Sequence, residues 1–66
     1  MAENRKIIVA RAELALTQLD LANAVGVSRQ TIICIEKGNY NPSLKLCKAI
    51  CKKLNKTLDE LFGEEQ

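Results

Sequence analysis

Four side chains, spaced along one stretch of the chain, carry groups that can read the edges of DNA base pairs. Arginine can hold guanine with two hydrogen bonds, glutamine can hold adenine in the same way, and an aliphatic side chain can contact the methyl group of thymine. At about 100° per residue, the four fall on one outward arc of a helix. The predicted base-reading residues are Arg29, Gln30, Ile33 and Cys34.

Two short helices joined by a tight turn are expected to hold this arc. Thr17 can cap a helix over residues 18–25. Gly26 can adopt, at little cost, the left-handed conformation that ends it. Ser28 can cap the second helix, over residues 29–36, which carries the arc. This arrangement is the geometry of a helix-turn-helix.

The stretch from Val25 to Leu44, VGVSRQTIICIEKGNYNPSL, resembles the phage-repressor or XRE-type helix-turn-helix proteins, and the resemblance covers nearly the whole chain. The buried positions of such a unit match the spacing of Gln18, Ala22, Gly26, Ile32 and Ile35. The resemblance implies an all-α, five-helix, lambda-repressor-like fold that binds DNA and regulates transcription. Repression is the mode of action that the resemblance favours.

Three further helices complete the expected fold, which forms one domain over residues 1–66. The predicted helices cover about residues 5–14, 18–25, 29–36, 44–54 and 58–62. The first is expected to turn Ile7, Ala10 and Leu14 inward. The fourth is expected to bury Leu46, Ile50 and Leu54, backed by Leu44, Cys47 and Cys51.

The resemblance also assigns roles to polar residues. It implies a partly buried ion pair between Arg11 and Glu36, which we expect to fix the angle between the first and third helices. It implies a DNA phosphate contact for Gln18, at the start of the second helix. The other candidates for phosphate contacts are Ser28, Thr31, Lys37, Asn39, Tyr40 and Asn41. Asn39 and Asn41 equally suit plain turn chemistry, and Tyr40 could pack on the fourth helix.

The last helix shows more apolar surface than so short an element can bury internally. Leu58, Leu61 and Phe62 are therefore predicted to join two copies of the chain as a homodimer, although Leu58 also suits an ordinary core position. Two or three base-reading contacts per copy are too few to single out one genomic site. A two-fold dimer would place two reading helices about 34 Å apart on a palindromic operator.

The charge is distributed unevenly along the 66 residues, whose net charge is +2. Residues 1–56 hold all ten Lys and Arg against four acidic residues, a net of +6, and residues 57–66 hold four acidic residues and no basic one. A basic body with an acidic end suits an anionic partner approached from one side.

Other classes of function are poorly supported. The chain has no His, no cofactor motif and no paired carboxylates in a plausible cleft, so we expect no enzyme, no cofactor and no small-molecule ligand. Its three thiols, at Cys34, Cys47 and Cys51, suit packing better than a metal site. The sequence shows neither an apolar run as long as a membrane span nor the layout of a signal peptide, which predicts a cytoplasmic protein.

Two alternatives stay open. Ile33 and Leu19 could form the centre of a protein-binding face, because the same fold occurs in antitoxins and adaptor domains. Oxidation of Cys34 within the reading arc could also switch DNA binding off.

Overall fold

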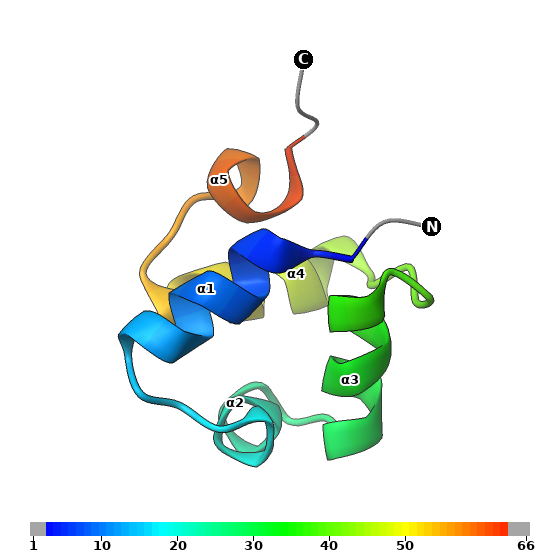
Figure 1. The fold of residues 1–66 in the computed structure, drawn as a ribbon. Coiled ribbons are helices and arrows are strands. Elements are labelled where there is room, and N and C mark those ends of the chain that lie inside the picture. Colours follow the sequence, from blue (N-terminus) through cyan, green and yellow to red (C-terminus); the bar gives the residue numbers. More distant parts are fainter. Residues whose placement is uncertain (1–2, 64–66) are drawn as a thin grey trace.

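A computed structural model describes residues 3–63 of the chain. Within them, five helices and no strand are formed: α1 (Arg5–Glu13), α2 (Gln18–Val25), α3 (Arg29–Lys37), α4 (Leu44–Leu54) and α5 (Leu58–Phe62). Figure 1 shows α1 across the middle, with α5 on one side of it and α2 on the other, and with α3 standing at one end. The predicted all-α, five-helix fold is confirmed.

Local sequence signals set the ends of α2 and α3. The Thr17 hydroxyl accepts from the backbone N–H of Asp20 at 3.0 Å, and the Asp20 carboxylate accepts from the Thr17 N–H at 2.9 Å, which completes a capping box. Gly26 ends α2 at a φ of 78°, a conformation that costs glycine little. Ser28 then caps α3 by accepting from the Thr31 N–H.

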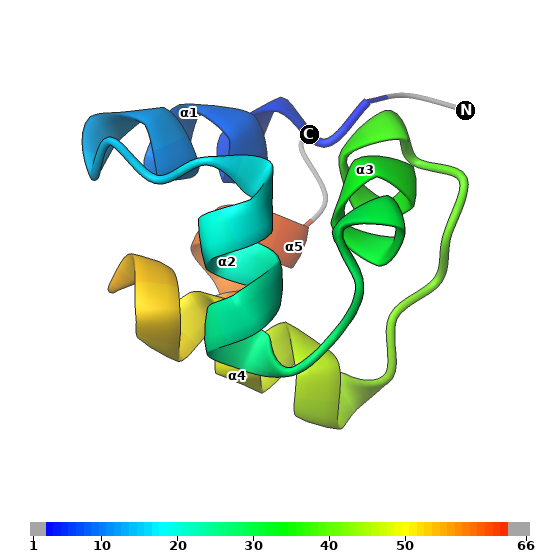
Figure 2. The same cartoon turned by 90° about the horizontal axis from the view of Figure 1, so that it is seen from below.

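The core consists of aliphatic side chains and one thiol from all five helices. α2 packs on both α3 and α4, as the view in Figure 2 shows. Ala22 is completely buried, and its small side chain lets α2 lie close to its neighbours. The buried hydrophobic residues are Ile7, Ala10, Leu21, Ala22, Ile32, Ile35, Ile50, Cys51, Leu54 and Leu61.

The prediction that Leu14 faces inward is wrong. α1 ends at Glu13, close to its predicted end at about Leu14, and Leu14 is 48% exposed. The chain reverses through Ala15, whose φ is 55°, while the Leu16 N–H bonds back to the Arg11 carbonyl. Leu14 is the C-cap residue and lies in the turn that follows the last helical residue.

Two other side chains differ from their predicted places. Leu44 is the first residue of α4 and is 62% exposed, so it does not back the seam of that helix. Leu61 is only 2% exposed because α5 packs against both α1 and α4. The prediction that Leu61 forms part of a dimer surface is therefore wrong. α3 also extends one residue further than predicted, to Lys37, before Gly38 ends it at a φ of 80°.

Candidate nucleic-acid interface

The first turn of α3 presents two exposed side chains of the type that reads base edges. Arg29 and Gln30 are both exposed, whereas Ile33 and Cys34 are half-buried. The Gln30 amide Nε2 donates to the Cys34 sulfur at 3.6 Å, one helical turn further on. The four predicted base-reading residues thus lie on one helix, but Arg29 and Gln30 are the more exposed pair.

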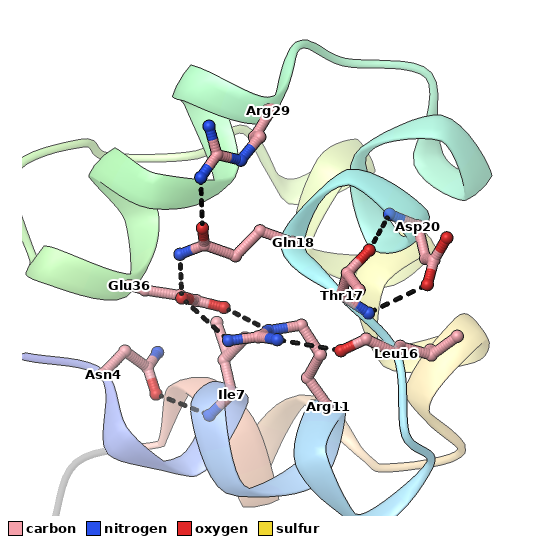
Figure 3. Close-up of polar contacts among 9 residues, drawn as sticks. All are labelled: Asn4, Ile7, Arg11, Leu16, Thr17, Gln18, Asp20, Arg29 and Glu36. Atoms are coloured by element: carbon pink, nitrogen blue, oxygen red, sulfur yellow. Dashed lines mark hydrogen bonds and ion pairs between the residues drawn. The ribbon is translucent and has the colours of Figure 1, made fainter.

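A buried carboxylate lies behind this surface. Glu36, near the end of α3, is 4% exposed. Its Oε2 accepts from Arg11 Nε at 2.8 Å, and Arg11 Nη1 donates to the Leu16 carbonyl at 2.8 Å (Figure 3). The structure therefore brings Arg11 and Glu36 together. Through these two bonds, Arg11 links α1 to α3 and to the turn before α2. A buried pair of this kind is costly to break from one side, because the remaining charge has no partner.

Gln18 connects the buried pair to the exposed end of α3. Its Nε2 donates to Glu36 Oε1 at 3.0 Å, and its Oε1 accepts from Arg29 Nη2 at 3.4 Å (Figure 3). One row of side chains thus runs from Arg11 inside the protein to Arg29 at the surface. The family resemblance predicts a DNA phosphate contact for Gln18, but its bonds to Glu36 and Arg29 could not be predicted from the sequence, because contacts between different helices leave no signal in local spacing.

The remaining candidates for phosphate contacts surround the two ends of α3. At its start, the hydroxyls of Ser28 and Thr31 lie 3.0 Å apart, and Ser28 also caps the helix. The four candidates at or beyond its end are all exposed: Lys37, Asn39, Tyr40 and Asn41. Backbone amides and hydroxyls at a helix start, with exposed polar groups around it, suit contact with phosphate oxygens.

The α5 face differs from the predicted dimer surface. Leu58 and Phe62 are half-buried and pack against the core, and Leu61 is buried. Two of the three predicted residues thus retain some accessible surface. Thr57 and Glu60 form a second capping box at the start of this helix.

The thiols of α4 are poorly suited to ionisation. Burial raises the pKa of the Cys47 thiol, and burial together with the neighbouring Cys47 raises the pKa of Cys51. Among residues 3–63, no three His, Cys, Asp or Glu side chains are grouped closely enough to hold a metal ion. No helix in the same part of the chain has the length and hydropathy needed to cross a membrane.

Comparison with known proteins connects this geometry to a family. The pattern of the family described as Helix-turn-helix matches residues 7–61. A protein of Methanocaldococcus jannaschii named as an uncharacterized HTH-type transcriptional regulator is 56% identical over 52 residues, which are 79% of each chain. The immunity repressor protein of Bacillus phage phi105 is 35% identical over 65 residues, 98% of this chain and 45% of the repressor.

A solved structure shares the arrangement of the helices. The restriction-modification controller protein C.AhdI from Aeromonas hydrophila superposes with a TM-score of 0.82 at 27% identity, over 89% of each chain. With so large a share of the chain covered, the likeness is not restricted to the α2–α3 pair.

Proposed function

This chain belongs to the helix-turn-helix family of transcriptional regulators, and on that premise we propose that it is a repressor that binds a palindromic operator as a homodimer, with α3 in the major groove. Membership of this family makes the chain a regulator and not an enzyme. Steric block of a promoter by a bound dimer suffices for repression.

The observation that carries the proposal is the placement of Arg29 and Gln30. Both are exposed on the first turn of α3, and Gln18 holds the Arg29 guanidinium at 3.4 Å. An arginine restrained in this way loses less side-chain freedom on binding than an unrestrained one, which favours a directed contact with guanine. Gln30 is suited to adenine next to it. Ile33 and Cys34, which keep part of their surface, are assigned to adjacent base edges.

Residues around both ends of α3 are proposed to fix the protein on the phosphates. Ser28 and Thr31 stand at its start, and Lys37 stands at its end. Asn39, Tyr40 and Asn41 continue the exposed surface beyond it. Phosphate contacts of this kind set the position on the duplex and carry no sequence information. Gln18 can add one, since the amide nitrogen that bonds Glu36 has a second hydrogen.

The two copies are proposed to meet through the remaining surface of Leu58 and Phe62 on α5. Leu61 is buried within its own copy, so this surface is smaller than the sequence indicated. Neighbouring residues would have to contribute to the dimer interface. Phe62→Asp is expected to give monomers in sedimentation experiments, with Asn23→Asp on the exposed surface of α2 as a control for the added charge. A Phe62→Asp protein that still sediments as a dimer would rule out this interface.

The proposed function is tested by selecting duplexes from random DNA and titrating the enriched sequence by fluorescence anisotropy. We expect a palindromic sequence, and a fall in log affinity with log salt of about 0.9 for each phosphate contacted. Arg29→Ala and Gln30→Ala should each cost about 1 to 3 kcal/mol and relax the preference at one base position. Lys52→Ala removes an exposed α4 charge and should leave the preference unchanged.

One observation favours a second candidate, a protein-binding module. Leu19 on α2 is 51% exposed, and Ile33 retains part of its surface. An apolar protein contact depends little on salt, so the titration separates the two functions. No enriched sequence together with a flat salt response would support the module, and Leu19→Ser would then be expected to abolish partner binding.

A further inference from the structure

Asn4, immediately before α1, bonds to three different helices. Its Oδ1 accepts from the Ile7 N–H at 3.2 Å and so caps α1. Its backbone N–H donates to the Glu36 carbonyl at 2.8 Å, near the end of α3. Its Nδ2 donates to the Leu61 carbonyl at 3.0 Å, in α5. A single side chain and its own peptide group therefore join α3 to α5.

The surroundings of Asn4 make these bonds important for the position of α5 relative to α3. An open hollow of about 600 Å³ lies beside Asn4, and its lining includes Ile35 of α3 and Leu61 and Phe62 of α5. Side chains therefore do not fill this part of the space between α3 and α5. The Leu61 carbonyl belongs to a five-residue helix, and the last carbonyls of a helix have no hydrogen-bond donor within it. The Asn4 amide supplies a donor to this carbonyl.

We propose that Asn4 is a positioning residue that fixes α5 relative to α3 and thereby sets the distance and angle between the two reading helices of the dimer. This inference rests on the proposed function, in which α5 joins the copies and α3 reads DNA. The link is specific to asparagine. Aspartate and serine can cap a helix equally well, but neither an ionised carboxylate nor the short serine hydroxyl can supply the Nδ2 donor.

Two substitutions separate this role from capping. Asn4→Ser keeps the cap and removes the donor, and Asn4→Asp keeps the cap and sets a carboxylate oxygen against the Leu61 carbonyl. Asn23→Ser makes the same amide-to-hydroxyl change on the exposed surface of α2 and is the control. Both Asn4 variants should remain folded with the circular dichroism of the wild type.

The first measurement uses the protein without DNA. Residual dipolar couplings of the backbone N–H groups should fit α3 and α5 as one rigid body in the wild type and in Asn23→Ser. In both Asn4 variants, the couplings of α5 should no longer fit the orientation of the rest of the molecule. Couplings that fit as well as those of the wild type would overturn the proposal, whether or not the protein binds DNA.

The second measurement uses three duplexes: a single half-site, the selected palindrome, and the palindrome with two base pairs inserted at its centre, which turns one half-site by about a fifth of a helical turn. In the Asn4 variants, the preference for the selected spacing should fall by about threefold or more, while half-site affinity stays as in the wild type. An unchanged spacing preference would overturn the inference and leave the proposed function standing. Absence of binding by the wild type to the selected palindrome would instead refute the proposed function.

Discussion

Gln18 and Glu36 are joined by a hydrogen bond of 3.0 Å between the carboxamide nitrogen at the start of α2 and a buried carboxylate near the end of α3. The same carboxylate bonds Arg11 of α1, and the carbonyl oxygen of Gln18 accepts from Arg29. The two helices of the helix-turn-helix are therefore connected by polar groups as well as by their apolar contact. The orientation of α3 and the position of one proposed base-reading side chain depend on the same few atoms.

Replacement of Gln18 by alanine is predicted to reduce both stability and DNA affinity. It removes one donor from a buried carboxylate, which should lower the free energy of unfolding by about 1.5 to 3 kcal/mol, and it releases the Arg29 guanidinium. Urea unfolding and anisotropy titration measure the two effects. Asn23→Ala removes an exposed amide from the same helix and should change the unfolding free energy by no more than about 0.5 kcal/mol. Equal results for the two variants would contradict the prediction.

Replacement of Arg11 by methionine is predicted to be more damaging. It leaves Glu36 buried without its cationic partner, at a cost of roughly 3 to 5 kcal/mol. Thermal unfolding measures the loss. The double variant Arg11→Met, Glu36→Leu removes both charges and should recover most of the stability, since an apolar pair can replace a buried ion pair. It should not recover DNA affinity, because Gln18 then has no carboxylate to hold it. Unchanged melting and DNA affinity in Arg11→Met would refute a role in fixing the α1–α3 angle.

Replacement of Ala15 by glycine is predicted to stabilise the protein. The φ of 55° at Ala15 costs an L-residue about 1 to 2 kcal/mol, and the extra freedom of glycine in the unfolded chain offsets part of the gain. A net increase of about 0.5 to 1 kcal/mol should appear in urea unfolding. Ala12→Gly, in the exposed part of α1, should have the opposite sign and cost about 1 kcal/mol. Destabilisation by Ala15→Gly would show that this turn is not strained.

Stability is predicted to fall in acid through the two capping boxes. Hydrogen bonds from the Thr17 backbone and hydroxyl lower the pKa of Asp20, and a hydrogen bond from the Thr57 backbone is the main cause that lowers the pKa of Glu60. The folded state therefore binds these protons less readily than the unfolded state does. The stabilisation is complete above the ordinary carboxyl pKa values, about 4 to 4.5, and is lost as the pH falls through the lowered ones.

Urea unfolding between about pH 2.5 and pH 7 measures this effect. The variant Asp20→Asn, Glu60→Gln keeps oxygen acceptors for the Thr17 and Thr57 N–H groups but cannot titrate, so its unfolding free energy should depend less on pH. The variant Glu13→Gln, Asp59→Asn removes two exposed carboxylates outside the capping boxes and serves as the control for the loss of two charges. A pH dependence in the double variant as steep as that of the wild type would assign the acid sensitivity to other groups.

The helices and most of their ends can be predicted from the sequence alone, because those signals are local. Caps at Thr17, Ser28 and Thr57 act on N–H groups three residues away, and glycines at 26 and 38 take the left-handed conformation that ends the helix before each of them. Helical spacing likewise predicted that Ile32, Ile35 and Ile50 are buried. The failure at Leu14 has a local origin too, since alanine at position 15 gives no sign of the left-handed turn that it makes.

The polar contacts between helices and the accessible apolar surface depend on how the helices pack together. Leu61 is buried because α5 lies against α1 and α4, a placement that no spacing within α5 encodes. Gln18 bonds both Glu36 and Arg29 because α2 packs against α3. Hydrogen bonds between helices depend on the relative positions of whole elements. Packing of the complete core sets those positions, so the connection of the reading surface to the interior emerges only in the folded chain.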